Sequence, residues 1–260
     1  MNLTDSESAK GSNRVRVGLG RGPTDYATLR APWHPHENYP ELETPTEKEV
    51  SHPQNRVFAA VRDALVGLGL DSEKVGSPHW NPIRSIVPAG GTVVLKPNFI
   101  RHWNPASEQD PGASVDSVIT HGSVVRAAAE YAFLAVGPEG RVIVAEAAQQ
   151  DCNFDLIREI AGLDEIQNYF RESHEFELEI LDLRREQVHF TDGVITSREP
   201  LPGDPRGYRA VDLGDKSFFT DSGLDPNLFR GADYDPGPTS EHHSNGRNAY
   251  LLSETVLSAD

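Results

Sequence analysis

The chain has 260 residues, a net charge of −16 and a single cysteine, Cys152. This length is enough for one large core, so we expect a single α/β domain over 14–260 after a disordered polar tail at 1–13. One cysteine excludes an internal disulfide framework and an iron–sulfur cluster held by four cysteines of this chain. The 40 acidic residues against 24 basic ones argue against a nucleic-acid partner, because phosphate backbones are bound by clustered Lys and Arg.

No apolar run is long enough to span a bilayer, and the N-terminus lacks the basic-then-apolar pattern of a signal peptide. We therefore expect a cytoplasmic protein without a membrane partner. Twelve acidic and four basic residues lie between Glu146 and Glu186, which is half of the net negative charge. This stretch is typical of a solvated acidic face.

The N-terminal part of the chain contains one predicted strand and one predicted helix. Alternation at 14–19 predicts a strand, and the glycines at 18, 20 and 22 that follow are interpreted as a turn, because no helix follows them as a dinucleotide site requires. The Pro-rich segment 31–47 predicts an extended arm over a surface, through which two copies of the chain could associate. Apolar residues with helical spacing predict a helix over 55–70.

The middle of the chain alternates between strand and helix patterns. This order predicts a mostly parallel sheet with a βαβαβ core, a Rossmann-like half. The predicted strands are 92–96, 141–145 and 176–183, and the predicted helical segments are 123–136, 154–161 and 164–170.

Beyond Gln187 the pattern changes. We expect a β-hairpin with strands at 188–190 and 194–196 around the turn at 191–193. The rest, 197–247, is rich in Pro, Gly and Asp and predicts a long irregular region with one short strand at 208–213.

Ligands of open parallel sheets bind beyond the carboxyl ends of the strands. Here the first two strands end in Lys96-Pro97-Asn98 and in Glu146, and the helix between them begins at 120–123. A helix N-terminus favours an anion, so we predict a small anionic ligand. The expected anion-binding residues are Lys96, Asn98, Thr120, Gly122 and Ser123, and the expected acid/base residues are His121 and Glu146.

Each of these residues also has a structural interpretation. Lys96 could simply leave a buried strand for solvent, and Asn98 could form only a turn. Thr120 or His121 could cap the helix, and Glu146 could pair with Lys96 or Arg101 to neutralise a charge at the sheet edge.

Other candidates are weaker. Cys152 has no local basic residue to lower its pKa, which disfavours a thiolate nucleophile. His242 and His243 are adjacent and would point apart, so we expect no metal site. No pattern in the sequence indicates a cofactor.

Four segments together resemble the domain of unknown function 362 family, over about residue 14 to the last residue. They are 93–99 (VVLKPNF), 117–126 (SVITHGSVVR), 141–146 (RVIVAE) with Gln150-Asp151, and 250–260 (YLLSETVLSAD). The resemblance implies an α/β domain and a Lys-Pro-Asn site at Lys96, Pro97 and Asn98, but no defined reaction. The most similar members occur among polysaccharide-biosynthesis genes. Relatives continue past the position of Asp260 into another strand and a Lys/His-rich motif, so we expect the domain to be incomplete at its C-terminus.

From these observations we expect an enzyme, or the N-terminal part of one, that acts on a sugar phosphate or a carboxylate. Two alternatives remain open. One is a non-catalytic binding or regulatory domain on the same scaffold, and the other is an inactive truncated product.

Overall fold

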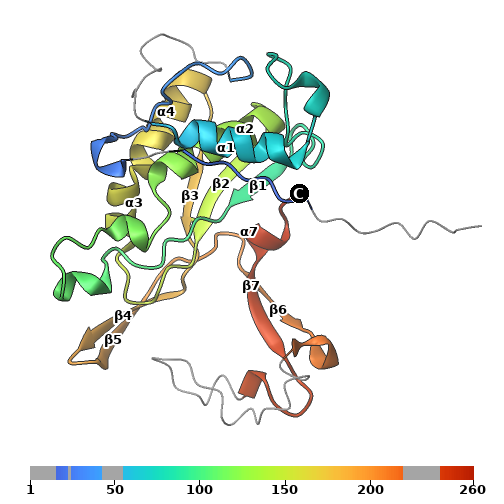
Figure 1. The fold of residues 1–260 in the computed structure, drawn as a ribbon. Helices are drawn as coiled ribbons and strands as arrows, with labels where there is room; N and C mark the ends of the chain where they lie inside the picture. Colours follow the sequence, from blue (N-terminus) through green and yellow to red (C-terminus); the bar gives the residue numbers. More distant parts are fainter. Residues whose placement is uncertain (1–15, 23–24, 43–54, 219–240) are drawn as a thin grey trace, which may run out of the picture.

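The three predicted core strands form one parallel sheet in the order β1-β2-β3 (Figure 1). The computed structural model describes residues 16–22, 25–42, 55–218 and 241–260. The sheet consists of β1 (Thr92–Leu95), β2 (Arg141–Glu146) and β3 (Glu179–Asp182). The helices that connect these strands are α2 (Gly122–Val136), α3 (Phe154–Ala161) and α4 (Leu163–His174). This arrangement confirms the predicted α/β class and its βαβαβ core.

The central strand β2 is buried because it lies between β1 and β3. Residues Val142 to Ala145 are each at most 1% exposed, as expected for a strand covered on both faces. Val142 and Val144 belong to the main apolar core together with Ala129 and Val136 of α2. The helix α2 packs against both β1 and β2 and also contacts α3. It ends at Val136, and the capping residue Gly137 has a φ of 74°, which lies in the region that favours glycine.

A second apolar cluster joins α1 (Val57–Leu68) to α2 through Phe58 and Tyr131. The described part of the N-terminal arm enters both clusters: Trp33 packs in the main core, and Tyr39 and Leu42 pack in the second. The arm does not merely lie over a surface, because its large apolar side chains are buried in the core. The predicted association of two copies through this arm stays a prediction.

The expected strand at 14–19 is absent from its described residues 16–19, which have no regular secondary structure and pair with no described strand. Instead they lie along α1. A Cβ on Gly18 would lie 1.8 Å from the carbonyl oxygen of Ala64, and one on Gly20 would lie 1.7 Å from that of Ala60. These glycines therefore allow a close backbone-to-helix contact, and their interpretation as a turn is wrong. The expected disordered tail at 1–13 lies outside the described residues.

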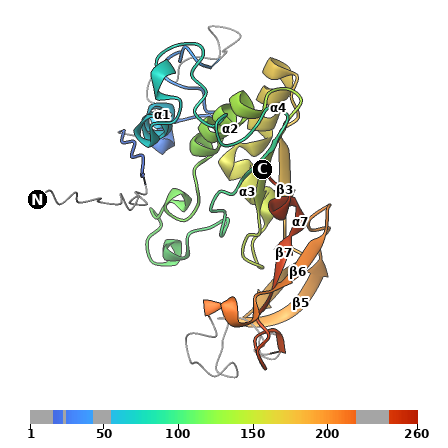
Figure 2. The ribbon, with the colours of Figure 1, turned by 90° about the vertical axis from the view of Figure 1, so that its right-hand side faces the viewer.

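Two antiparallel hairpins follow the sheet and project away from the helices (Figures 1 and 2). The first confirms the predicted hairpin, with longer strands, and its turn residues Asp192 and Gly193 have φ of 52° and 75°. Positive φ at both positions is typical of a two-residue type I′ turn. The hairpin strands are β4 (Glu186–Thr191) with β5 (Val194–Pro200), and β6 (Tyr208–Asp212) with β7 (Ala249–Ser253).

The region 197–247 is less irregular than expected, because β5 extends into it. The strand predicted at 208–213 is present as β6 and pairs with β7. Its residues 219–240 lie outside the described part. The third strand is shorter than predicted, since Phe176 and Leu178 precede β3 and are buried in the core.

The short helix α7 (Glu254–Leu257) brings the chain back to the sheet. The Asp260 N–H donates to Thr92 O at 3.1 Å, and its carboxylate accepts from Thr92 N at 2.8 Å. Residue 260 therefore lies beside the first residue of β1 (Figure 1). No helix among the described residues is both long and apolar enough to cross a membrane.

Candidate functional site

Glu146 is the centre of the rim where the parallel strands end. Its carboxylate accepts from Lys96 Nζ at 2.8 Å, from Ala147 N at 2.8 Å and from Phe99 N at 3.3 Å. Its backbone carbonyl accepts from Leu183 N at 2.8 Å. One residue thus connects the ends of all three strands. The Glu146 side chain is 7% exposed and that of Lys96 is 67% exposed, so the cation lies on the solvent side of the pair.

Asn98 and Thr120 hold the base of the loop that links β1 to α2. Asn98 N donates to Thr120 Oγ1 at 2.9 Å, and Thr120 N donates to Asn98 O at 2.9 Å. The Asn98 amide also donates to Val118 O at 2.9 Å. These bonds fix the loop next to Lys96, and the Thr120 hydroxyl oxygen already accepts one of them.

The other three predicted residues, His121, Gly122 and Ser123, are buried at the start of α2. His121 caps the helix, because its Nδ1 accepts from Ser123 N at 3.2 Å. Its ring stacks on Tyr26 with centroids 4.1 Å apart and meets Trp33 edge-on at 4.5 Å. Burial lowers the pKa of His121, although nearby Asp116 acts in the opposite direction. The imidazole is therefore held as a neutral cap.

Gly122 is packed against the end of α3. A Cβ at this position would lie 1.8 Å from Ala161 O and 2.4 Å from Trp33 Nε1. Trp33 Nε1 itself donates to Ala161 O at 2.9 Å. The structure thus pairs Lys96 with Glu146 and Asn98 with Thr120, and it places the residues that follow Thr120 against the N-terminal arm and α3.

A cleft of about 550 Å³ adjoins the rim on the side of β2, β3 and the second hairpin. Leu183, whose N–H is bonded to Glu146, is one of its walls. Tyr208 of β6 forms another wall and donates from its hydroxyl to Leu183 O at 2.6 Å. The hydrogen bond therefore attaches β6 to the end of the sheet, and the cleft lies between these two elements.

Two consecutive arginines in this cleft have different roles. Arg184 is buried, pairs with Asp182 and donates to Cys152 O at 2.6 Å, so it holds the loop after β2 in place. Arg185 is exposed and forms no ion pair with a described residue; its guanidinium carbon lies 5.8 Å from the centroid of the Tyr208 ring. Arg185 is thus a cation available to a ligand.

The sequence-based prediction missed Arg185, although a signal was present. The rule that ligands bind beyond the carboxyl ends of parallel strands applies to the third strand as well as to the first two. The dipeptide Arg184-Arg185 follows that third strand in a locally acidic stretch. Which of the two arginines is exposed depends on tertiary contacts, and no local pattern indicates it.

A separate hollow of about 390 Å³ contains His102 and Asp151, two more residues that the sequence-based prediction left out. His102 Nδ1 accepts from Asn153 N at 3.0 Å, and Asp151 Oδ1 is buried without a hydrogen-bond partner among the described residues. Burial lowers the pKa of His102, and Arg184 lowers it further, whereas Asp151 raises it. His102 lies in an aperiodic loop, so its position near Asp151 had no sequence signal.

Burial raises the pKa of Cys152 to about 11, in line with its interpretation as a poor nucleophile. His243 Nδ1 lies 3.3 Å from Asn248 Oδ1. In the described part of the chain, no three His, Cys, Asp or Glu side chains are grouped to hold a metal ion.

The fold and this rim define a mixed α/β protein with a parallel three-stranded sheet and a cleft at the carboxyl ends of its strands. Comparisons with protein-family models, with curated proteins and with solved structures find no match. The resemblance to the domain of unknown function 362 family therefore stays a prediction from the quoted segments.

Proposed function

We propose that the chain binds a small anionic molecule, a sugar phosphate or a carboxylate, at the rim of the sheet, and that Glu146 exchanges a proton with it. The observation that carries the proposal is the Lys96–Glu146 pair, which adjoins the cleft that contains Arg185. Relatives expected from the resemblance occur among polysaccharide-biosynthesis genes, so a sugar phosphate is the first ligand to test.

The charges around the cleft favour an anion. Glu146 neutralises Lys96 and Asp182 neutralises Arg184. Glu186, which also lines the cleft, is neutralised by Arg198, and Arg185 has no acidic partner among the described residues. Other exposed arginines of the described part also lack an ion pair, and Arg185 is the one of them that lines this cleft. An arginine fork and a lysine point charge are both suited to phosphate oxygens.

The pairing also suggests how binding would be coupled to proton transfer. The Lys96 side chain is 67% exposed and can rotate from Glu146 toward a bound anion. Glu146, which is 7% exposed, would then be buried without its cation. Both changes favour the protonated carboxyl group, because the cation stabilised the charged form and burial opposes it. Glu146 would thus take up a proton from solvent on binding and hold it ready for donation to the bound ligand, as a general acid does.

A non-catalytic binding domain is the second candidate. It is favoured by the two backbone donors on Glu146, Phe99 N and Ala147 N, which give this carboxylate a structural role even without substrate.

Isothermal titration calorimetry with glucose 1-phosphate tests the binding, and glucose is the uncharged control. We expect Lys96→Gln and Arg185→Gln each to weaken glucose 1-phosphate binding by about tenfold or more, since each removes a charged hydrogen-bond donor. Lys74→Gln is a matched control, because Lys74 is also exposed and pairs with Asp71 at 3.0 Å but does not line the cleft. The same loss in all three variants, or no binding by the unmodified chain, would contradict the proposal.

The same titrations in buffers of different ionisation enthalpy count the protons taken up. Catalytic use of Glu146 predicts proton uptake in the unmodified chain and none in Glu146→Gln. Binding without proton uptake would favour the non-catalytic domain.

A further inference from the structure

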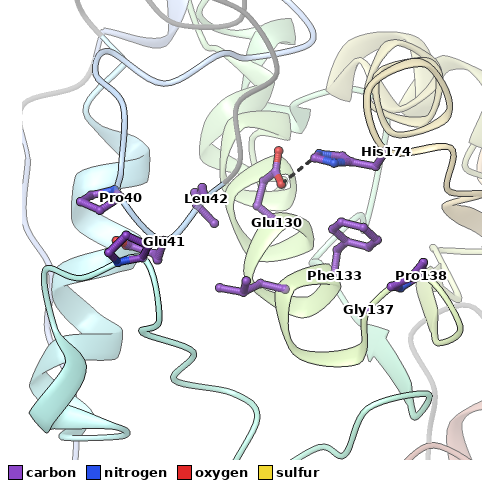
Figure 3. Close-up of a pocket in the computed structure, with 10 residues that line it drawn as sticks. Pro40, Glu41, Leu42, Glu130, Phe133, Gly137, Pro138 and His174 are labelled. Atoms are coloured by element: carbon purple, nitrogen blue, oxygen red, sulfur yellow. Dashed lines mark ion pairs between the residues drawn. The ribbon is translucent and has the colours of Figure 1, made fainter.

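A hollow of about 300 Å³ lies between the N-terminal arm and the C-terminal half of α2, outside the rim site. Figure 3 shows Pro40 and Leu42 on one side and Phe133 and Pro138 on the other. Together with Pro78 and Leu134, these apolar side chains form most of its wall. The volume is at the lower end of the range of about 300–1,000 Å³ for small-molecule sites.

The polar side chains of the wall are Glu41, which is buried and paired with Arg62 at 2.6 Å, and two that face each other, Glu130 of α2 and His174 at the end of α4 (Figure 3). Their side chains are 7% and 9% exposed, and His174 Nε2 lies 3.6 Å from Glu130 Oε2. This separation is too long for a hydrogen bond. His174 Nε2 is buried and has no hydrogen-bond partner among the described residues.

The other oxygen of the carboxylate is already satisfied. Glu130 Oε1 accepts from Arg126 Nη2 at 2.5 Å, and the Arg126 side chain is 1% exposed. Arg126 therefore neutralises the charge of Glu130. Two polar atoms remain in the apolar wall, 3.6 Å apart. Glu130 Oε2 is a hydrogen-bond acceptor, and His174 Nε2 has no hydrogen-bond partner among the described residues.

We propose that this hollow binds a small uncharged molecule with an apolar body and one hydroxyl group, which bridges Glu130 and His174. The hydroxyl donates its hydrogen to Glu130 Oε2 and accepts from His174 Nε2–H, so both polar atoms are satisfied. The apolar body contacts Leu42 and Phe133. An anion is disfavoured beside the carboxylate, and an ammonium group would add an uncompensated charge to a neutral, largely buried site.

Water alone would satisfy the pair less well. At about 30 Å³ per molecule, the hollow would hold roughly ten waters, and most of them would face apolar side chains. An amphiphilic molecule satisfies the polar pair and also removes apolar surface from water.

Titration of the full chain with benzyl alcohol, followed by the NMR signals of the histidine rings, tests this site. We expect a saturable shift of the His174 signals. Toluene, which lacks the hydroxyl, should bind about tenfold more weakly, the effect of one hydrogen bond to a charged group. Benzoate should cause no shift. His189 is the internal control, because it also lies 3.6 Å from a carboxylate, that of Glu199, but is 48% exposed.

The variant His174→Phe keeps a ring against Phe133 and removes the nitrogen. It should bind benzyl alcohol about tenfold more weakly and toluene at least as well as the unmodified chain does. Equal affinity of the unmodified chain for benzyl alcohol and toluene overturns the proposal without any variant. Shifts at His189 as large as those at His174, or no response to benzyl alcohol, overturn it as well.

Discussion

Replacing Arg126 by Met tests the buried ion pair between Arg126 and Glu130, two residues of α2. Arg126 pairs with Glu130 at 2.5 Å, donates to Pro32 O at 2.9 Å, and lies 3.5 Å from the centroid of the Tyr169 ring. Met keeps most of the apolar stem of Arg. The Glu130 carboxylate would stay buried without its cation, with the His174 ring 3.6 Å away.

The expected loss in unfolding free energy is about 3–5 kcal/mol, the usual effect of removing one partner of a buried pair. With a urea m value of about 3 kcal/mol/M for a chain of this size, the midpoint of urea unfolding should fall by about 1–1.7 M. The double variant Arg126→Met with Glu130→Leu removes both charges. It should return to within about 1 kcal/mol of the unmodified chain, because well-packed apolar residues replace buried pairs at little cost.

The pH dependence provides an independent check. Burial alone would raise the pKa of Glu130, but the Arg126 guanidinium beside it holds this pKa below its ordinary value. The stability that this carboxylate contributes is therefore present above its unfolded pKa of about 4.3 and is lost as pH falls through the folded pKa. Without Arg126, burial dominates and raises the pKa of Glu130. The deficit of Arg126→Met should therefore shrink between about pH 7 and pH 5.

Urea unfolding followed by circular dichroism measures each of these differences. A deficit of Arg126→Met below about 1 kcal/mol, a deficit that is the same at both pH values, or a double variant as unstable as the single one would refute the reasoning.

Two predictions concern the start of α2, and both can be measured by urea unfolding. Between about pH 7 and pH 5, the His121→Asn variant should lose less unfolding free energy than the unmodified chain does. Burial lowers the pKa of His121, so the stability that the neutral ring contributes is lost as pH falls below about 6.5. Asn also caps the helix but does not titrate. Equal losses would contradict this. Gly122→Ala should cost at least about 2 kcal/mol, because its Cβ would lie 1.8 Å from Ala161 O; a cost below about 0.5 kcal/mol would show that α3 can move away.

Much of the fold could be predicted from local patterns. The apolar run at Thr92–Leu95, the nearly all-apolar helix Gly122–Val136 and the strand Arg141–Glu146 appear in the structure within about two residues of their predicted bounds. Each of these segments carries its signal in its own periodicity, and buried strands separated by helices form parallel pairs. The turn at Asp192-Gly193 was likewise predictable, because it depends on the two residues themselves.

The candidate site could be predicted only in part. The strand-end rule correctly placed Lys96 and Glu146 at one rim, where they pair directly. It could not indicate that His121 would turn toward Tyr26 and Trp33, because these aromatic residues lie about ninety residues earlier in the chain. It also could not separate Arg185, which is exposed, from Arg184, which is buried.

The sequence by itself thus determined the order of the elements, the direction of the strands and the rim at which Lys96 and Glu146 meet. The tertiary structure alone decided that the glycines at 18 and 20 lie against α1, that Arg126 and Glu130 form a buried pair near His174, and which cations face solvent. The physical reason is the range of the interactions. Periodicity and turn chemistry act between residues close in sequence, whereas burial and charge pairing depend on segments that meet only after the chain has folded.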